Sequence, residues 1–135
     1  MRPDADFRDG LTLFNAGQFF DAHEALEDIW REAPRESRVR RHLQGLVQLA
    51  VAFHHQSTRN LVGARSVLRR ALKNLEGAEE SFPELDWAKL GLSLEAWREY
   101  LEHSGDAPDG RGARRSIARK LPPLPTITFR SERRR

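Results

Sequence analysis

The amino-acid sequence predicts an all-α protein, a compact single-domain bundle of about five helices. Apolar residues recur at the spacing of amphipathic helices through most of residues 1–105. Glycine, proline and asparagine stand between these segments, where helices commonly begin or end. A chain of 135 residues matches one domain with a core of moderate size. The helices are therefore expected to pack on one another around one core.

The first two helices are expected to form an N-terminal hairpin. Phe7, Leu11 and Phe14 share one face of a short helix, which Gly17 ends. A second helix is predicted over residues 19–33, and the following proline stops it. Because the connection is so short, the hairpin is expected to be tight.

A third helix is predicted over residues 37–59, and apolar side chains cover half of its circumference or more. Such a helix belongs in the centre of the bundle. Gly45 in its middle costs about 1 kcal/mol relative to alanine in helix propensity, so we expect a neighbouring helix to approach closely there. The narrow remaining stripe is polar and comprises Arg41, Gln44, Gln48 and His55.

Two further helices and an extended segment complete the predicted fold. Asn60 is expected to cap a fourth helix whose apolar face runs to Ala78. Residues 82–91 are expected to be irregular, and Ser93 is expected to cap a last helix that ends at Gly105. The sequence LPPLPTITF is too rich in proline for a helix, so we expect it to lie over the body as an extended C-terminal strap.

The chain is expected to divide into a helical domain, residues 1–105, and a basic, proline-containing strap and tail, residues 106–135. Residues 1–110 carry 14 basic and 19 acidic side chains, whereas residues 111–135 carry nine basic and one acidic. A cationic tail can bind phosphate backbones, fold back on the acidic body or keep the protein in solution. Folding back on the body or keeping the protein in solution is the favoured role, because no recognition motif accompanies the arginines. Any nucleic-acid binding is expected to use residues 111–135 alone.

Composition excludes several classes of function. No apolar run reaches the roughly 18 residues that cross a bilayer, and MRPDADFRDG lacks the features of a secretory signal. We therefore expect a cytoplasmic protein without a membrane partner. The absence of cysteine excludes disulfides, thiolate-bound zinc and thiol nucleophiles.

The most informative positions lie on the apolar side of the second helix. His23 falls just inside the apolar arc beside Trp30, and Glu27 lies one turn after His23. Burying an ionisable group without a partner is costly or shifts its pKa. We therefore expect His23 and Glu27 to bond each other or a group brought by another helix, with the polar stripe of the third helix facing them.

Three interpretations fit these residues, two chemical and one structural. His23, Glu27 and His55 could hold a divalent metal ion such as zinc, iron or manganese, with Gln48 in support. The spacing departs from the zinc-protease signature His-Glu-x-x-His, because Glu27 stands where the second histidine should be. Without a metal, His23 could act as an acid or base with Glu27 orienting its ring, although no serine elbow supplies a nucleophile. The remaining interpretation is purely structural: His23 bonds Glu27, and hydrogen bonds tie the third helix to the hairpin through Gln44, Gln48 and His55.

The other histidines are not predicted to be ligands. His42 and His103 have polar surroundings in the sequence and are expected to be exposed. His54 falls within the apolar arc of the third helix. Any site is therefore expected to depend on His23 and His55.

Three stretches together resemble the domain of unknown function family 309: FNAGQFFDAHEALEDIWR, QGLVQLAVAFHH and NLVGA, at residues 14–31, 44–55 and 60–64. The resemblance runs through residues 7–80 in order and spacing. It implies a compact all-helical prokaryotic protein whose biochemical role is not established. The characteristic polar residues that it implies are His23, Glu24, Glu27, Gln48 and His55, with Trp30 and Arg31 closing the first motif. The arginine-rich end is not explained by the family pattern.

The sequence therefore predicts a helical protein whose polar pocket binds a small ligand or a partner protein, with a homo-oligomer as one form of partner. The predicted pocket comprises His23, Glu24, Glu27, Trp30, Arg31, Gln44, Gln48 and His55. A metal-dependent or acid–base enzyme using the same pocket is the alternative. Nucleic-acid binding through the basic tail is the third hypothesis.

Overall fold

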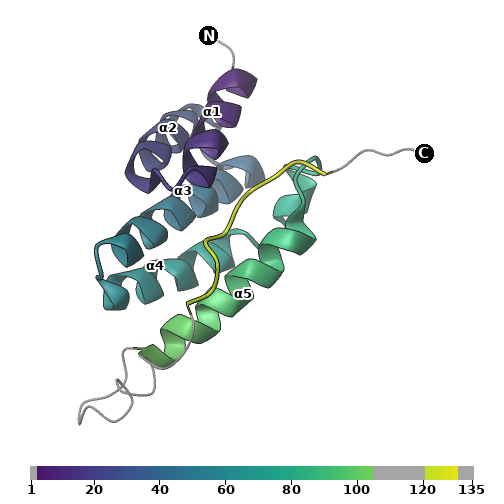
Figure 1. Cartoon of the computed structure of the whole chain (residues 1–135). Coiled ribbons are helices and arrows are strands. Elements are labelled where there is room, and N and C mark those ends of the chain that lie inside the picture. Colours follow the sequence, from purple (N-terminus) through teal and green to yellow (C-terminus); the bar gives the residue numbers. More distant parts are fainter. Residues whose placement is uncertain (1–2, 105–120, 131–135) are drawn as a thin grey trace.

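The computed structural model describes residues 3–104 and 121–130, and the described chain forms five α-helices. They are α1 (Pro3–Asn15), α2 (Phe19–Glu32), α3 (Arg38–Ser57), α4 (Leu61–Asn74) and α5 (Trp87–Ser104), with a 3₁₀ turn η1 (Ala78–Glu80) before α5. The α1–α2 hairpin lies on one side of α3 and α4 on the other (Figure 1). The predicted all-α bundle is confirmed. Among the described helices, none is both long and apolar enough to cross a membrane.

The α1–α2 hairpin turns at Gly17, as predicted. Gly17 has a φ of +82°, and the backbone N–H of Gln18 donates to the carbonyl of Leu13 at 2.9 Å. A left-handed glycine after the last helical turn satisfies carbonyls that would otherwise lack partners. The two helices cross closely, because a Cβ at Gly10 would lie 2.8 Å from Cδ2 of Leu26.

The α3 helix is central, as its wide apolar face predicts. Its Phe53 ring meets the rings of Phe14 on α1, Phe19 on α2 and Trp97 on α5, at centroid distances of 6.3, 5.8 and 5.3 Å. These four aromatic residues are all buried. One α3 side chain thus joins three other helices into a single core, and the burial of that apolar surface is the main force that holds them.

The α4 helix begins as predicted and ends earlier than predicted. The side-chain oxygen of Asn60 accepts the backbone N–H of Gly63 at 3.0 Å, which is the expected N-cap. The helix ends at Asn74, whereas the apolar pattern predicted continuation to Ala78. The physical reason is a turn at Gly77, which has a φ of +80° and leads into the 3₁₀ turn. Ala78 is still buried, so the apolar pattern marks burial beyond the helix end.

The α5 helix begins at Trp87, so the predicted irregular stretch over residues 82–91 and the predicted cap at Ser93 are wrong in part. Asp86 is the residue whose side-chain oxygen accepts an N–H of the first turn, from Lys89 at 3.0 Å. An aspartate one residue before a helix is a strong N-cap. Gly91 does not end the helix, because a single glycine inside a helix costs only about 1 kcal/mol.

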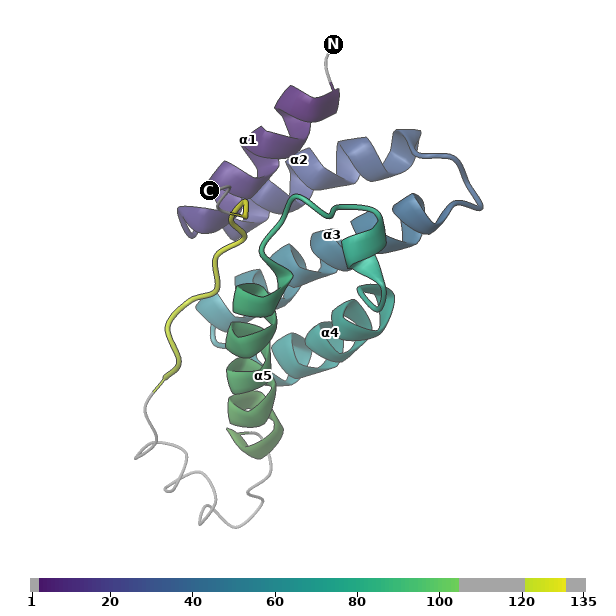
Figure 2. The same ribbon diagram turned by 90° about the vertical axis from the view of Figure 1, so that its right-hand side faces the viewer.

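Residues 121–130, which we call the strap, run in extended conformation back along α5 toward α1 (Figures 1 and 2). Ile127 is buried, and Leu85 and Phe129 form an isolated antiparallel bridge. The predicted extended strap is confirmed over these residues. Most of the basic tail falls on residues 105–120 and 131–135, which lie outside the described part of the chain.

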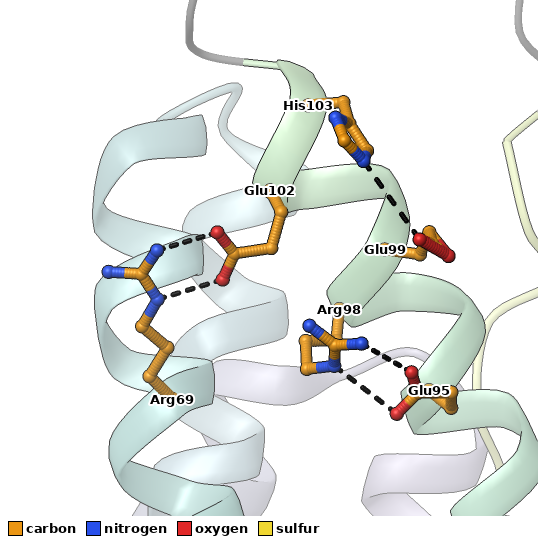
Figure 3. Close-up of polar contacts among 6 residues, drawn as sticks. All are labelled: Arg69, Glu95, Arg98, Glu99, Glu102 and His103. Atoms are coloured by element: carbon orange, nitrogen blue, oxygen red, sulfur yellow. Dashed lines mark hydrogen bonds and ion pairs between the residues drawn. The ribbon is translucent and has the colours of Figure 1, made fainter.

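A bidentate ion pair joins α4 to α5. Arg69 donates from Nε and Nη2 to the two carboxylate oxygens of Glu102, at 2.8 and 2.6 Å (Figure 3). Two further pairs lie within α5, between Glu95 and Arg98 and between Glu99 and His103. The hydrogen bond from Arg69 lowers the pKa of Glu102 below its ordinary value.

This lowered pKa predicts an acid-sensitive contribution to stability. A carboxylate with a depressed folded-state pKa stabilises the fold fully above the ordinary pKa of about 4.3, and the contribution is lost as pH falls through the lowered value. Glu102→Gln should therefore flatten the fall in thermal midpoint on acidification below that pH, relative to the unaltered chain. Glu24→Gln, a change at an exposed α2 carboxylate, is the control. Equal slopes for Glu102→Gln and the unaltered chain would contradict the prediction.

Candidate functional site

His23 and Glu27 lie together on α2, as predicted. His23 Nε2 is 3.4 Å from Glu27 Oε1, and the two side chains are 26% and 30% exposed. Glu27 Oε2 is in turn 3.6 Å from Arg31 Nη2, and Arg31 also contacts Asp28 at 3.2 Å. Glu24, by contrast, is exposed. Three of the predicted residues, His23, Glu27 and Arg31, thus form a row of ionisable groups along α2, which we call the charged row. His23 and Glu27 are partly buried, whereas the Arg31 side chain is exposed.

The polar stripe of α3 is bonded to α4 rather than to this row. Gln48 Oε1 accepts from Asn74 Nδ2 at 2.8 Å, and Arg41 donates to the carbonyls of Lys73 and Glu76. Gln44 is exposed. The prediction that this stripe faces His23 and Glu27 is therefore wrong, because the apolar surface of α3 is what packs against α2.

His55 lies at the far end of α3 and takes part in the start of α4. Its Nδ1 is 3.3 Å from Asn60 Nδ2, beside the α4 cap. Within the described residues, no group of three or more histidine, aspartate or glutamate side chains is placed to hold a metal ion. The structure therefore does not assemble His23, Glu27 and His55 as ligands, and the predicted metal set is corrected on this point.

A row of aromatic rings connects the two predicted histidines indirectly. Phe20 is 51% exposed and lies between His23 on α2 and His54 on α3, with ring centroids 5.9 and 5.5 Å away. His54 is 6.3 Å from His55. Sequence reasoning set His54 aside because of its place in the apolar arc. No spacing within either helix could have found this contact, because it joins Phe20 on α2 to His54 on α3.

Trp30 packs at the other end of α2, against a cation. The Arg40 guanidinium lies 4.3 Å from the centroid of the Trp30 ring and donates to the carbonyls of Trp30 and Ala33, at 3.2 and 3.0 Å. Arg40 thus satisfies carbonyls that the last turn of α2 leaves open. Sequence reasoning missed this arginine, since its partner carbonyls are not visible in residue spacing.

His42 is buried, although the sequence predicts exposure. Its Nδ1 lies 2.6 Å from Ser81 Oγ, and its Nε2 lies 3.0 Å from the carbonyl of Glu76. Both ring nitrogens therefore bond the connection between α4 and α5. The correction has a physical reason, because a polar residue can be fully buried when every polar atom has a partner.

A groove opens between α1, α2 and the start of α3. It has a volume of about 860 Å³. Its apolar lining comprises Leu13, Ala25, Ile29, Ala33, Pro34, Val39 and Leu43. Its charged lining comprises Asp6, Asp9, Asp28, Glu32 and Arg31. The groove therefore combines an apolar surface with four carboxylates and one guanidinium.

The groove and the charged row of α2 meet at Arg31. This arginine contacts Glu27 on one side and Asp28 on the other, and it also lines the groove. Since its charge is shared with two carboxylates, the lining as a whole is acidic. This surface was not predicted from the sequence. The carboxylates of each helix are visible in the sequence, but the groove exists only because α1 and α2 pack together, which neither helical pattern shows alone.

Comparisons with known proteins find a family model and uncharacterized bacterial relatives. The model of the family described as a domain of unknown function, DUF309, matches residues 7–67. The chain is 34% identical to the uncharacterized protein YpuF of Bacillus subtilis strain 168, over 76% of this chain and 59% of that protein. An uncharacterized protein of Aquifex aeolicus strain VF5 is 29% identical, over 70% of this chain and 26% of that protein. The chain thus spans less than two thirds of the length of these relatives, and the predicted family resemblance is confirmed.

Proposed function

Since the DUF309 match over residues 7–67 carries no established activity, we propose from the geometry that this protein is a protein-interaction module. Its binding surface is the groove between α1, α2 and α3, and its partner is a cationic, amphipathic segment of another protein. The observation that carries the proposal is the combination of an apolar lining with an excess of carboxylates. We also propose a cytoplasmic location, as the sequence predicts.

The dimensions of the groove suit a short helical segment. Along α2 the lining runs from Ala25 to Ala33, which corresponds to about 12 Å of helix at a rise of 1.5 Å per residue. An amphipathic helix binds such a surface with its apolar side chains inward. Val39 at the start of α3 is exposed and available for that contact.

The negative charge of the groove lining favours a partner segment with positive charge. Asp6 and Asp9 lie on α1, while Asp28 and Glu32 lie on α2. Lysine or arginine side chains on the polar edges of a bound helix would reach the carboxylates of both α1 and α2. Complementary charge of this kind speeds association and rejects acidic segments. Binding should accordingly weaken as salt screens the exposed charges.

A labelled peptide tests this proposal. We expect a fluorescein-labelled peptide with leucine on one helical face and lysine on the other to bind the full chain, and a peptide with glutamate in place of lysine not to bind. The double variant Asp9→Asn with Glu32→Gln should bind the lysine peptide about tenfold more weakly, which equals about 1.4 kcal/mol. Fluorescence anisotropy at two salt concentrations provides the measurement.

The matched control removes the same charge elsewhere on the hairpin. Asp21 and Glu24 are exposed on α2 and do not line the groove, so Asp21→Asn with Glu24→Gln should leave the affinity unchanged. Val39→Glu should weaken binding by disturbing the apolar lining. The proposal would be rejected by equal losses in the two double variants, or by equal binding of the two peptides.

The acid–base alternative has its own observation, the pair of His23 and Glu27. This pair is half-buried, and the contact of 3.4 Å would let Glu27 orient the ring. It remains a prediction. Nucleic-acid binding through residues 111–135 also remains a prediction, and ten of those residues alone, the strap, are described.

A further inference from the structure

The strap is held by bonds to its backbone. Asn15 on α1 donates from Nδ2 to the carbonyl of Ile127 at 2.9 Å and accepts the N–H of Ile127 at its Oδ1, at 2.7 Å. One amide side chain thus satisfies both polar groups of one strap residue. This geometry requires an extended segment, because the N–H and the carbonyl of the same residue must point to the same side.

Other groups continue the same pattern from α5 and the segment before it. Trp97 Nε1 donates to the carbonyl of Pro123 at 2.8 Å. The N–H of Asp86 donates to the carbonyl of Thr128 at 2.8 Å, and the N–H of Arg130 donates to the carbonyl of Glu84 at 2.7 Å. These bonds are made to main-chain atoms of the strap. Any extended segment could make them, and the side chains would decide which segment fits.

Alternate strap side chains fill the surface beneath. Pro125 and Ile127 are buried, and Phe129 lies under the guanidinium of Arg8 at 4.3 Å from its ring centroid. The spacing of two residues is that of one face of an extended chain. Leu121 and Leu124, by contrast, are exposed. Main-chain bonds with pockets for alternate side chains are how proteins recognise extended peptides.

We propose that the surface formed by α1, α5 and residues 84–86 is a peptide-binding site in its own right, separate from the acidic groove. Its ligand is an extended segment of a partner protein with proline, an aliphatic residue and an aromatic residue at alternate positions. The strap is the resident occupant. The chain contains no cysteine, so the strap is not fixed by a disulfide. A partner segment with the same chemistry competes with it.

The strength of competition between the strap and a free peptide follows from the tether that joins the strap to the chain. A segment tethered to its own site is present at an effective concentration on the order of millimolar. A free peptide of equal intrinsic affinity therefore binds weakly until the strap is displaced. Removing the buried side chain of the strap should expose the site and raise the apparent affinity for a free peptide.

The test uses the full chain and a fluorescein-labelled peptide with the sequence of residues 121–130. We expect Ile127→Asp in the chain to raise peptide affinity about 100-fold over the unaltered chain, in line with loss of a tethered competitor. Leu124→Asp is the matched control, because Leu124 is 50% exposed and its strap should stay bound. Adding Asn15→Ala to the Ile127→Asp chain should abolish the gain. A peptide with aspartate at the position of Ile127 should not bind.

A second measurement covers the case in which Ile127→Asp fails to fold by circular dichroism. A protease site placed in residues 105–120 allows the folded chain to be cut, and the labelled peptide should then exchange with the severed strap. Failure of the peptide to bind either the folded variant or the cut chain would overturn the proposal. Equal binding of a scrambled peptide would also overturn it. Dimers of the unaltered chain in light scattering, lost on Ile127→Asp, would assign the site to a second copy and overturn the assignment to a partner protein.

Discussion

Replacing His42 with alanine should lower the free energy of unfolding by about 3 kcal/mol, because it leaves a cavity and removes two hydrogen bonds. The ring is fully buried, and its two nitrogens bond Ser81 and the carbonyl of Glu76. Truncation leaves both partners without the ring. Because those partners belong to the connection between α4 and α5, the loss should also loosen that connection. Urea denaturation followed by circular dichroism measures the change.

Two further variants serve as a control and as a measure of one hydrogen bond alone. His103→Ala removes an exposed histidine whose side chain is 61% accessible, and should change stability by less than about 0.5 kcal/mol. Ser81→Ala keeps the ring and removes one hydrogen-bond partner, so it should cost about 1 kcal/mol. If His42→Ala were as mild as His103→Ala, the buried network would not hold α3 to the connection.

The helices themselves were largely readable from the sequence, because their signals are local. Gly17 ends α1 and Asn60 caps α4 where the residue types predict it. The errors occur where two local signals compete. Asp86 and Ser93 are both good caps, and the strand-like bridge of Leu85 with Phe129, which fixes the segment before Asp86, is a long-range contact. Spacing along one helix gives no information on such a contact.

The candidate site was readable only within one helix. His23 and Glu27 are one turn apart, so their contact follows from helix geometry. The partner of Gln48 depends on how α3 is rotated between α2 and α4. In the structure, the polar stripe of α3 faces α4, and Gln48 bonds Asn74. A helical wheel defines the faces of a helix and not the partner of each face. The acidic groove depends in the same way on the crossing of α1 and α2.

The α3 helix approaches α4 closely at Gly45, and replacement of this glycine by alanine should lower the free energy of unfolding by about 2 kcal/mol. A Cβ there would lie 2.6 Å from Cγ and 2.8 Å from Cδ2 of Leu75, and 3.3 Å from the carbonyl oxygen of Ala71. Leu75 is buried, so its branch point cannot move freely, and the helices must separate.

The same substitution in α5 provides the control and should have the opposite sign. Gly91 is exposed within the helix, and a Cβ there would meet nothing within 4 Å. Gly91→Ala should therefore raise stability by about 0.5 to 1 kcal/mol, through helix propensity alone. Thermal denaturation of the two variants side by side distinguishes propensity from packing. A stabilising Gly45→Ala would contradict the close packing of α3 on α4 and, with it, the rotation of α3 that brings Gln48 to Asn74.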